Sequence, residues 1–301
     1  MRVFVTGASG WIGSAVVPEL LDAGHQVVGL ARSDAAAAAL TAAGVEVQRG
    51  TIDDLDSLRN AAAASDGVIH LAFKHDIAFS GDFQGAADAD RRAIETFGDA
   101  LAGSDRPFVI ASGLFGLAQD RASTEQDGHG PVTSTGVAEA RRANAELTLS
   151  LASRGVRSSI VRLAPTVHGE GDHGFMATLV GNAREKGASG YLGDGANRWP
   201  AVHRLDAARL FRLALEQAPA GSTLHGVGEE GVPIRAVAEV IGQRLGIPVV
   251  PVAPEQAGEY FTWLAGFIGL DIPASNALTR ELLGWEPKQP GLLEDLAAHY
   301  G

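Results

Sequence analysis

Several short segments of the chain hold residues whose types and spacing suit chemistry on a bound nucleotide. Residues 6–13 read TGASGWIG, with glycines at positions 7, 10 and 13. The first glycine permits a tight turn, the second lets the backbone approach a diphosphate, and the third lets a helix pack close to a strand. The helix that follows would face the anion with unpaired N–H groups and a partial positive charge. The segment predicts a dinucleotide-binding turn with contacts from Thr6, Gly7, Ser9, Gly10, Trp11, Ile12 and Gly13.

The end of the next apolar segment indicates which dinucleotide is preferred. Arg32 and Ser33 follow it, where a carboxylate would otherwise grip a ribose 2′-hydroxyl. A guanidinium pairs with a phosphate in a fork, so this pair suits a 2′-phosphate. We therefore expect NADP(H). NAD(H) is the less favoured alternative, in which Asp34 binds the ribose and Arg32 is a solvated loop residue.

Two further segments carry side chains able to handle a proton or orient a substrate. Lys74 and His75 directly follow an apolar segment that ends at residues 71–73. Ligands of parallel sheets bind at the carboxyl ends of strands, and histidine is a natural acid near neutral pH. Ser112 ends another apolar segment, where its hydroxyl would orient a carbonyl or a nitrogen. The alternatives are a solvated charged loop for the first pair and an ordinary strand-end hydroxyl for Ser112.

The elements that would position these residues alternate along the chain. Short apolar runs predict strands at 2–6, 26–31, 45–48, 67–72, 107–112 and 157–163. Segments with helical periodicity lie between them, including 11–24 and 33–43. This alternation is typical of a parallel sheet covered by helices on both faces. We predict an α/β fold, a Rossmann-type doubly wound parallel sheet with a smaller C-terminal substrate-binding lobe.

The domain organisation follows from where the alternation stops. After Leu163 the chain becomes glycine-rich, with a predicted helix at 175–186. We assign residues 1–166 to the dinucleotide-binding domain, with a return segment at about 201–216, and residues 167–301 mainly to the lobe. Within the lobe, EYFTWLAGFIGL at 259–270 predicts a helix with one apolar face.

The composition excludes several classes of partner. The 24 basic and 36 acidic residues give a formal net charge of −12, which argues against nucleic acid or an anionic membrane as partner. The chain has no cysteine, so it makes no disulfide and no thiolate metal site. It also has no signal-like N-terminus and no apolar stretch long enough to span a membrane. We expect a cytoplasmic protein that binds a small molecule.

By these motifs the chain resembles the extended short-chain dehydrogenase/reductases, the group that contains the NAD-dependent epimerases and dehydratases. The resemblance also rests on GTIDDLDSL (50–58), VIHLA (68–72), VIASGLFG (109–116), RLAPTVHGEGDHG (162–174), WPAVHRLDAA (199–208) and ELLGWEPKQPGLLEDL (281–296). It implies that Ser112 is the family's catalytic serine. Further contacts are implied to the cofactor from Ile52, Leu71, Ala72, Pro165 and Val167, and to the substrate from Ser112, Phe73 and His168. It also implies a homodimer built on helices around 84–102 and 134–154.

The resemblance breaks at the family's catalytic pair. A tyrosine there acts as general acid, and a lysine four residues later holds the nicotinamide ribose; GVAEARRANAE at 136–146 has neither. Glu146 fits the glutamate that usually follows the lysine, which puts Arg142 at the lysine position and Ala138 at the tyrosine position. Arginine can hold ribose hydroxyls but keeps its proton far above neutral pH, and alanine has no proton to give. We expect Arg142 to anchor the ribose and His75, Lys74 or water to supply the proton.

Three lobe residues are candidates for shaping a substrate pocket. Tyr191 and Trp199 would form an aromatic wall, and Arg198 would supply a fixed cation; packing between the lobes is the alternative role. Histidines also gather in this region, at positions 168, 173 and 203, beside acidic residues. Their spacing in flexible turns does not support a metal site, and we predict none.

These features favour an NADP(H)-dependent oxidoreductase that transfers hydride to a small carbonyl, imine or activated alkene. The second hypothesis is a non-catalytic NADP(H)-binding sensor, which the missing tyrosine supports. The third is an epimerase or dehydratase acting on a nucleotide sugar. It is disfavoured because such chemistry needs a strong acid-base residue where Ala138 stands.

Overall fold

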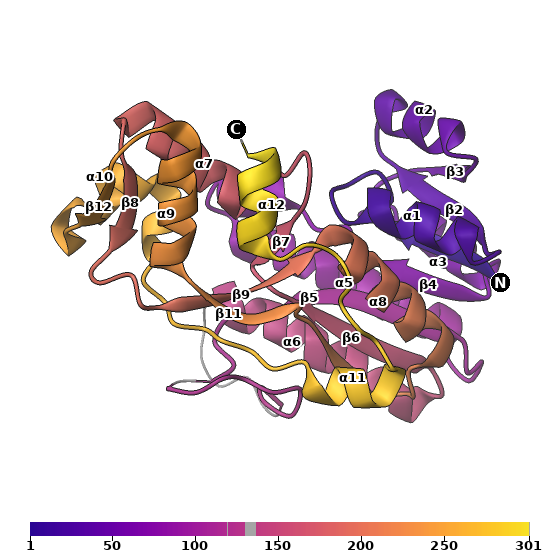
Figure 1. Ribbon diagram of the computed structural model, residues 1–301. Coiled ribbons are helices and arrows are strands. Elements are labelled where there is room, and N and C mark those ends of the chain that lie inside the picture. The colour runs from indigo at the N-terminus through magenta and orange to yellow at the C-terminus, as the bar shows by residue number, and fades with distance from the viewer. Residues whose placement is uncertain (119, 130–136, 301) are drawn as a thin grey trace.

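Seven parallel strands form the central sheet of this protein in a computed structural model, in the order β10-β6-β5-β4-β1-β2-β3 (Figure 1). The structure describes residues 1–118, 120–129 and 137–300, and for Phe79, Val137 and Ala138 the backbone alone. The strands are β1 (Arg2–Thr6), β2 (Gln26–Ala31), β3 (Glu46–Arg49), β4 (Gly67–His70), β5 (Pro107–Gly113), β6 (Arg157–Leu163) and β10 (Ser222–Gly226). The strand order reverses between β1 and β4, and ligands of such sheets bind where the order reverses, at the carboxyl ends of the strands.

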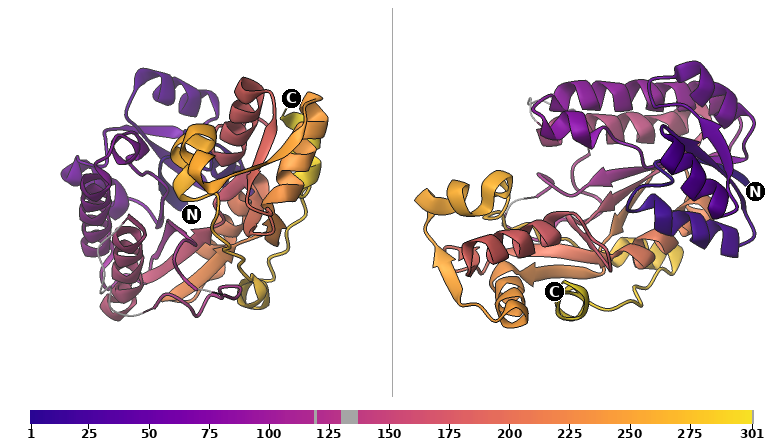
Figure 2. Two further views of the ribbon diagram at one scale, coloured as in Figure 1. Left: turned by 90° about the vertical axis from the view of Figure 1, so that its left-hand side faces the viewer. Right: turned by 90° about the horizontal axis from the view of Figure 1, so that it is seen from above.

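Helices cover both faces of this sheet because its strands are apolar on both sides. In β1, Val3 and Val5 belong to one buried core and Phe4 to the other. The first core is covered by α1 (Gly13–Asp22), α2 (Asp34–Ala42) and α8 (Arg204–Gln217). The second is covered by α3 (Leu55–Ala63), α5 (Phe83–Leu101) and α6 (Val137–Ser150). Figure 2 shows α5 and α6 side by side along this second face.

The lobe has two small sheets and its own apolar core. One sheet joins β7 (Thr166–His168), β9 (Arg198–His203) and β11 (Glu229–Pro233), and the other joins β8 (Ser189–Leu192) to β12 (Val249–Val252). Its main helices are α7 (Phe175–Lys186), α9 (Ile234–Leu245), α10 (Ala257–Phe261) and α12 (Leu292–His299). The remaining short elements are α4 (His75–Phe79), α11 (Ala277–Leu283) and the 3-10 helices η1 (Leu151–Arg154), η2 (Pro254–Gln256) and η3 (Thr262–Gly266).

The doubly wound fold expected from the sequence is confirmed, with two local differences. The strand β10 lies in a stretch assigned to the lobe, yet it pairs with β6 at the edge of the central sheet. The predicted helix at 259–270 is interrupted: α10 ends at Phe261, and η3 begins at Thr262. Thr262 has φ +55°, outside the helical region, so the chain turns there. In the described part of the chain, no helix combines the length and apolar character needed to cross a bilayer.

Candidate functional site

The glycine turn between β1 and α1 has the geometry that its sequence predicts. Gly7 has φ +68°, and a Cβ there would stand 2.8 Å from the Ala72 backbone nitrogen. A Cβ on Gly13 would stand 2.1 Å from the Gly7 carbonyl oxygen. The Gly10 N–H donates to that same oxygen at 3.0 Å. Side chains at positions 7 and 13 would therefore force the turn open.

The amino end of α1 suits an anionic ligand. Its N-cap residue, Ile12, makes no side-chain cap, and the first turn of the helix carries no acidic residue. The Ser14 and Ala15 N–H groups donate to the Gly10 and Ile12 carbonyls, so what this end offers an anion is chiefly the positive end of the helix dipole. Together with the glycine turn, this helix end fits the diphosphate of a dinucleotide.

Basic side chains gather at the carboxyl ends of β2 and β3. Arg32 is exposed and pairs with Asp76 at 3.3 Å, while the Ser33 hydroxyl caps α2 by accepting from the Ala36 N–H. Arg49, at the end of β3, donates to the Ser33 carbonyl at 2.6 Å and also binds the Asp34 carboxylate. Sequence reasoning missed Arg49. It directly follows the strand predicted at 45–48, and the parallel pairing of that strand with β2 sets Arg49 beside Ala31.

A chain of buried polar side chains runs from the glycine turn to α6. The Thr6 hydroxyl lies 2.6 Å from His70 Nδ1, and His70 Nε2 lies 3.1 Å from Asp90 Oδ1. The Thr6 oxygen also accepts the Ala72 N–H, so the pattern is satisfied when Thr6 donates to Nδ1 and Nε2–H donates to Asp90. The Asn144 amide donates to the second Asp90 oxygen at 2.8 Å.

Asp90 remains ionised in this buried chain. Burial opposes its charge, but the hydrogen bond from His70 and the charge of Arg141 outweigh that effect and hold the pKa of Asp90 below its usual range. Arg141 Nη1 lies 3.6 Å from Asp90 Oδ2. A buried charge without such partners would be costly, so Asp90 holds Arg141 close to it. The hydrogen bonds from Asp90 through His70 to Thr6 thereby fix the position of Arg141 relative to the glycine turn.

Arg141 itself lies at the carboxyl ends of β4 and β5. Its guanidinium carbon is 4.2 Å above the Phe73 ring centroid, and Nη2 donates to the Ala111 carbonyl at 3.1 Å. Neighbouring residues on an α-helix point about 100° apart. Arg142 lies within electrostatic reach of Arg162: burial lowers the pKa of Arg162 to about 10, and the charge of Arg142 contributes to that lowering.

The predicted proton donors have different surroundings. The His75 ring packs 5.1 Å from the Phe73 ring, and burial together with the charge of Arg141 lowers the pKa of His75. Lys74 Nζ instead pairs with the Asp53 carboxylate at 2.6 Å. Ser112 is buried at the end of β5, beside the Ala111 carbonyl that Arg141 binds. His75, Phe73, Ser112 and Arg141 thus share one edge of the sheet.

The position expected for a catalytic tyrosine lies only partly within the described structure. Ala138 is the second residue of α6, and its side chain and that of Val137 are outside the described residues. All three tyrosines of the chain lie at positions 191, 260 and 300. The hydroxyls of Tyr260 and Tyr300 are engaged within the lobe, by the Ala188 carbonyl and the Asp172 carboxylate.

Three of the predicted cofactor contacts, Leu71, Ala72 and Val167, lie against the glycine turn. Ile52 is buried, and the Leu71 N–H donates to the Thr6 carbonyl. The Trp11 indole N–H donates to the Val167 carbonyl at 2.9 Å, which ties the glycine turn to β7 of the lobe. The Arg204 guanidinium lies 4.2 Å above the Trp11 ring. Pro165 immediately precedes β7.

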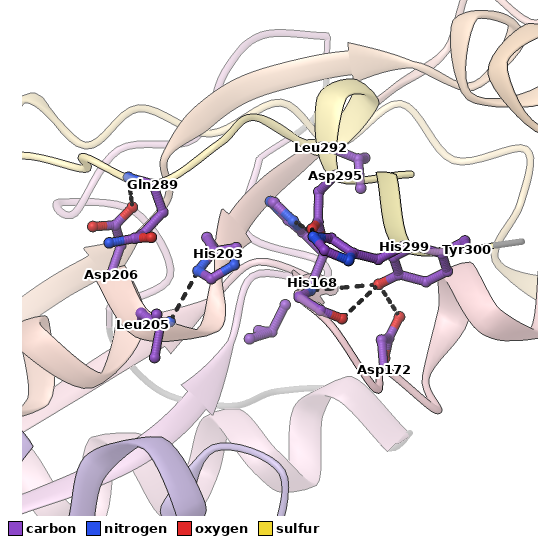
Figure 3. Close-up of polar contacts among 12 residues, drawn as sticks. His168, Asp172, His203, Leu205, Asp206, Gln289, Leu292, Asp295, His299 and Tyr300 are labelled. Carbon is purple, nitrogen blue, oxygen red and sulfur yellow. Dashed lines mark hydrogen bonds and ion pairs between the residues drawn. The ribbon is translucent and has the colours of Figure 1, made fainter. Parts of the chain in front are cut away.

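The predicted lobe residues are mostly occupied by internal contacts. Figure 3 shows His168 beneath α12, where its Nδ1 lies 2.8 Å from the Asp295 carboxylate and both side chains are buried. Tyr191 and Trp199 are buried, and the Trp199 indole donates to the Leu270 carbonyl at 3.0 Å. Arg198 forms a two-oxygen pair with Asp271. Among the residues that the structure describes, no group of three or more histidine or carboxylate side chains is arranged to hold a metal ion.

A buried ionisable residue outside the candidate site, His225, lies on β10. His225 is fully buried, and its Nδ1 lies 2.8 Å from the Ser275 carbonyl. Burial lowers the pKa of His225 from 6.5 to about 4. The unfolded chain therefore binds the extra proton between pH 6.5 and 4 and the folded chain does not. The free energy of unfolding should fall as the pH drops through this window, by on the order of 3 kcal/mol.

His225→Asn tests this pH dependence because asparagine can still donate to the Ser275 carbonyl. We expect urea unfolding of the variant to lose less stability between pH 6.5 and 4 than the wild type loses. His173→Asn, at an exposed histidine, should keep the wild-type dependence. Parallel pH profiles for wild type and His225→Asn would contradict the assignment.

Comparison with known proteins places these features in context. Residues 3–225 match the family model described as the NAD dependent epimerase/dehydratase family. The uncharacterized protein C2A9.02 of Schizosaccharomyces pombe is 48% identical over 99% of this chain and 99% of its own length. The 2-alkyl-3-oxoalkanoate reductase of Stenotrophomonas maltophilia is 27% identical over 83% of this chain and 77% of its own. In structure, the chain is similar to the dTDP-glucose 4,6-dehydratase DesIV of Streptomyces venezuelae with NAD bound. The TM-score is 0.79 at 22% identity, covering 100% of this chain and 96% of that one.

Proposed function

This chain belongs to the NAD-dependent epimerase/dehydratase family, and we propose that within it the protein is an NADP(H)-dependent reductase of small carbonyl, imine or activated alkene compounds. The observation that carries the proposal is the convergence of Arg141, His75 and Ser112 at the carboxyl ends of β4 and β5. These groups can bind and orient a substrate, while a tyrosine acid is missing from the sequence at this place.

Residues of this chain are available to bind each part of a dinucleotide. The glycine turn and the amino end of α1 would hold the diphosphate, and Arg32, Ser33 and Arg49 would hold the phosphate on the adenosine ribose. Arg32 would exchange its single, solvent-exposed contact with Asp76 for that phosphate. We propose that Arg141, rather than the predicted Arg142, binds the nicotinamide ribose, since Arg141 lies at the strand ends. When bound, NADPH would supply a hydride from C4 of its nicotinamide.

The proton would reach the substrate by a different route from the family's usual one. Arginine does not give up its proton near neutral pH, so Arg141 holds and orients groups. The lowered pKa of His75 keeps that imidazole mostly neutral at pH 7, so a proton passed through it comes ultimately from solvent. The Ser112 hydroxyl would orient the accepting oxygen or nitrogen. An iminium or activated alkene needs less acid help than a ketone, which suits this arrangement.

A panel assay tests the proposal. Purified protein is incubated with NADPH and a series of aldehydes, ketones, imines and enones, and NADPH oxidation is followed by absorbance. Turnover with at least one compound is expected. Binding of NADPH without turnover across the panel would instead favour the sensor, the second candidate function, which the missing tyrosine supports. Epimerase or dehydratase chemistry is disfavoured because it needs a strong acid-base residue at position 138.

The preference for NADPH can be tested at Arg32. Arg32→Asp should weaken NADPH binding at least about tenfold and leave NADH binding unchanged or stronger, because a carboxylate repels the 2′-phosphate and binds a 2′-hydroxyl. Calorimetric titration measures both affinities. Arg59→Asp, an equal charge change at an exposed position of α3, should leave both affinities near wild type. Unchanged NADPH binding by Arg32→Asp would remove Arg32 from this role.

We also propose that the protein is a homodimer paired through α5 and α6, the segments that the family resemblance implied. The two helices pack side by side and present a common outer surface (Figure 2). Sedimentation analysis would give the mass in solution, and a monomer at micromolar concentration would contradict this pairing. The cytoplasmic location expected from the sequence stays a prediction.

A further inference from the structure

We propose that four aromatic rings beyond the end of β5 bind the flat, uncharged aromatic or apolar body of the substrate. These rings belong to Phe115, Phe175, Trp263 and Phe267, and together we call them the aromatic platform. The inference rests on the proposed reductase function and adds the chemical class of what that site takes.

The aromatic platform joins the sheet to the lobe close to the proposed reaction centre. Phe115 follows Ser112 by three residues, and its ring lies 5.4 Å from that of Phe267. Phe175 begins α7, and its ring lies 5.2 Å from that of Trp263. The rings of Phe175 and Phe267 are close to parallel, at 29° and 6.2 Å. A planar group could extend this array by stacking on the exposed surface of Trp263.

The exposure of these rings separates them from aromatic residues that only fill a core. Phe97 and Phe108 also touch one another, but both are fully buried. In the platform, Trp263 is 44% exposed, and the three phenylalanines are partly exposed. Beneath them, Trp199 is buried, with its ring 5.5 Å from that of Phe175. The platform is therefore a supported apolar surface whose burial by a ligand would be favourable.

The charges around the platform argue against a nucleotide sugar as the ligand. A nucleoside diphosphate brings two phosphates that need cationic partners. Arg198, next to Trp199 in sequence, is already engaged by both oxygens of Asp271. In the same part of the lobe, Arg235 lies over the Tyr191 ring and pairs with Glu239 at 2.9 Å. Both guanidiniums are thus compensated, and a neutral apolar ligand fits this surface better.

Reduction of an aromatic aldehyde held on the platform balances in atoms and electrons. With an aromatic aldehyde stacked on the platform, its carbonyl would reach toward Ser112. Hydride adds to the carbonyl carbon and a proton to the oxygen, so the aldehyde is reduced to an alcohol and NADPH is oxidised to NADP⁺. No other oxidant or reductant is required.

Binding of a product-like alcohol tests the platform without turnover. The probes are 2-naphthalenemethanol and cyclohexylmethanol, titrated calorimetrically into full-length protein saturated with NADP⁺. We expect 2-naphthalenemethanol to bind at least about tenfold more tightly than cyclohexylmethanol, because the naphthyl ring can stack on the platform. Trp263→Ala should weaken naphthyl binding at least about tenfold. Leu282→Ala, at a residue of similar exposure on α11, should leave it unchanged.

The outcomes separate the platform from the proposed function. Equal binding of the two alcohols, or naphthyl binding unaffected by Trp263→Ala, overturns the platform. A change in oligomeric mass on Trp263→Ala without a change in naphthyl affinity also overturns it, because the rings would then be a subunit contact. NADPH oxidation with propanal but no preference for 2-naphthaldehyde leaves the reductase function standing and removes the platform. Naphthyl binding without turnover of any aldehyde, ketone, imine or enone of the panel keeps the platform and removes the reductase function.

Discussion

Replacing Arg141 by alanine is expected to lower kcat/KM for NADPH-dependent reduction at least about a hundredfold, because the side chain supplies the site's fixed cation. Its guanidinium stacks on Phe73 and is held by the Ala111 carbonyl and the Asp90 carboxylate. Removing it also leaves the buried Asp90 charge with less compensation. Steady-state rates with the best substrate from the panel give the measurement, and thermal unfolding shows whether the variant remains folded.

Two companion variants sharpen this result. Arg141→Lys keeps the charge but loses the planar stack and the forked hydrogen bonds, so an intermediate loss is expected. Arg142→Ala removes the neighbouring arginine and should change kcat/KM by less than about threefold, since that side chain belongs to the surroundings of Arg162. A larger loss from Arg142→Ala than from Arg141→Ala would restore the alignment that the sequence first indicated.

Gly13→Ala should weaken NADPH binding at least about a hundredfold. The new Cβ would stand 2.1 Å from the Gly7 carbonyl oxygen and 2.8 Å from two atoms of the Ala8 backbone, so the turn must shift. The backbone that should approach the diphosphate would move with it. Calorimetric titration with NADPH measures the loss, and a melting curve separates weak binding from unfolding.

Gly181→Ala is the matched control for that change. This glycine lies inside α7, and a Cβ there would meet nothing within 4 Å. It should keep NADPH affinity and gain slightly in thermal stability, because alanine favours the helix. Gly10→Ala has a single contact at 3.2 Å, so it should disturb the fold less than Gly13→Ala. Wild-type affinity in Gly13→Ala would mean that the dinucleotide lies elsewhere.

Continuous apolar runs and glycine spacing predicted most of the sheet and the phosphate turn. The strands at 2–6, 26–31 and 157–163 and the helix at 175–186 have the predicted bounds. The edge strand β10 was missed because Ser222 and Thr223 interrupt its apolar pattern, which an edge position tolerates. The interruption at Thr262 depends on a backbone angle that periodicity does not encode.

The candidate site was less predictable because it depends on contacts between distant residues. His70 and Asp90 are 20 residues apart, and Asn144 is 54 residues from Asp90. One signal was present: His70 interrupts an apolar strand, and a buried polar residue needs a partner. Choosing between Arg141 and Arg142 required knowing which side of α6 faces the sheet. The family's tyrosine and lysine would have marked that side, and both are missing from this sequence.

The docking of α12 makes the end of the chain indispensable to the lobe. A nonsense codon after Gly291 would spare every strand of the central sheet, yet it would strip His168 of Asp295 and Asp172 of the Tyr300 hydroxyl. The hollow left behind would open the lobe's apolar interior to solvent. Such late truncations would yield a protein that still folds around its glycine turn but is prone to aggregation and proteolysis.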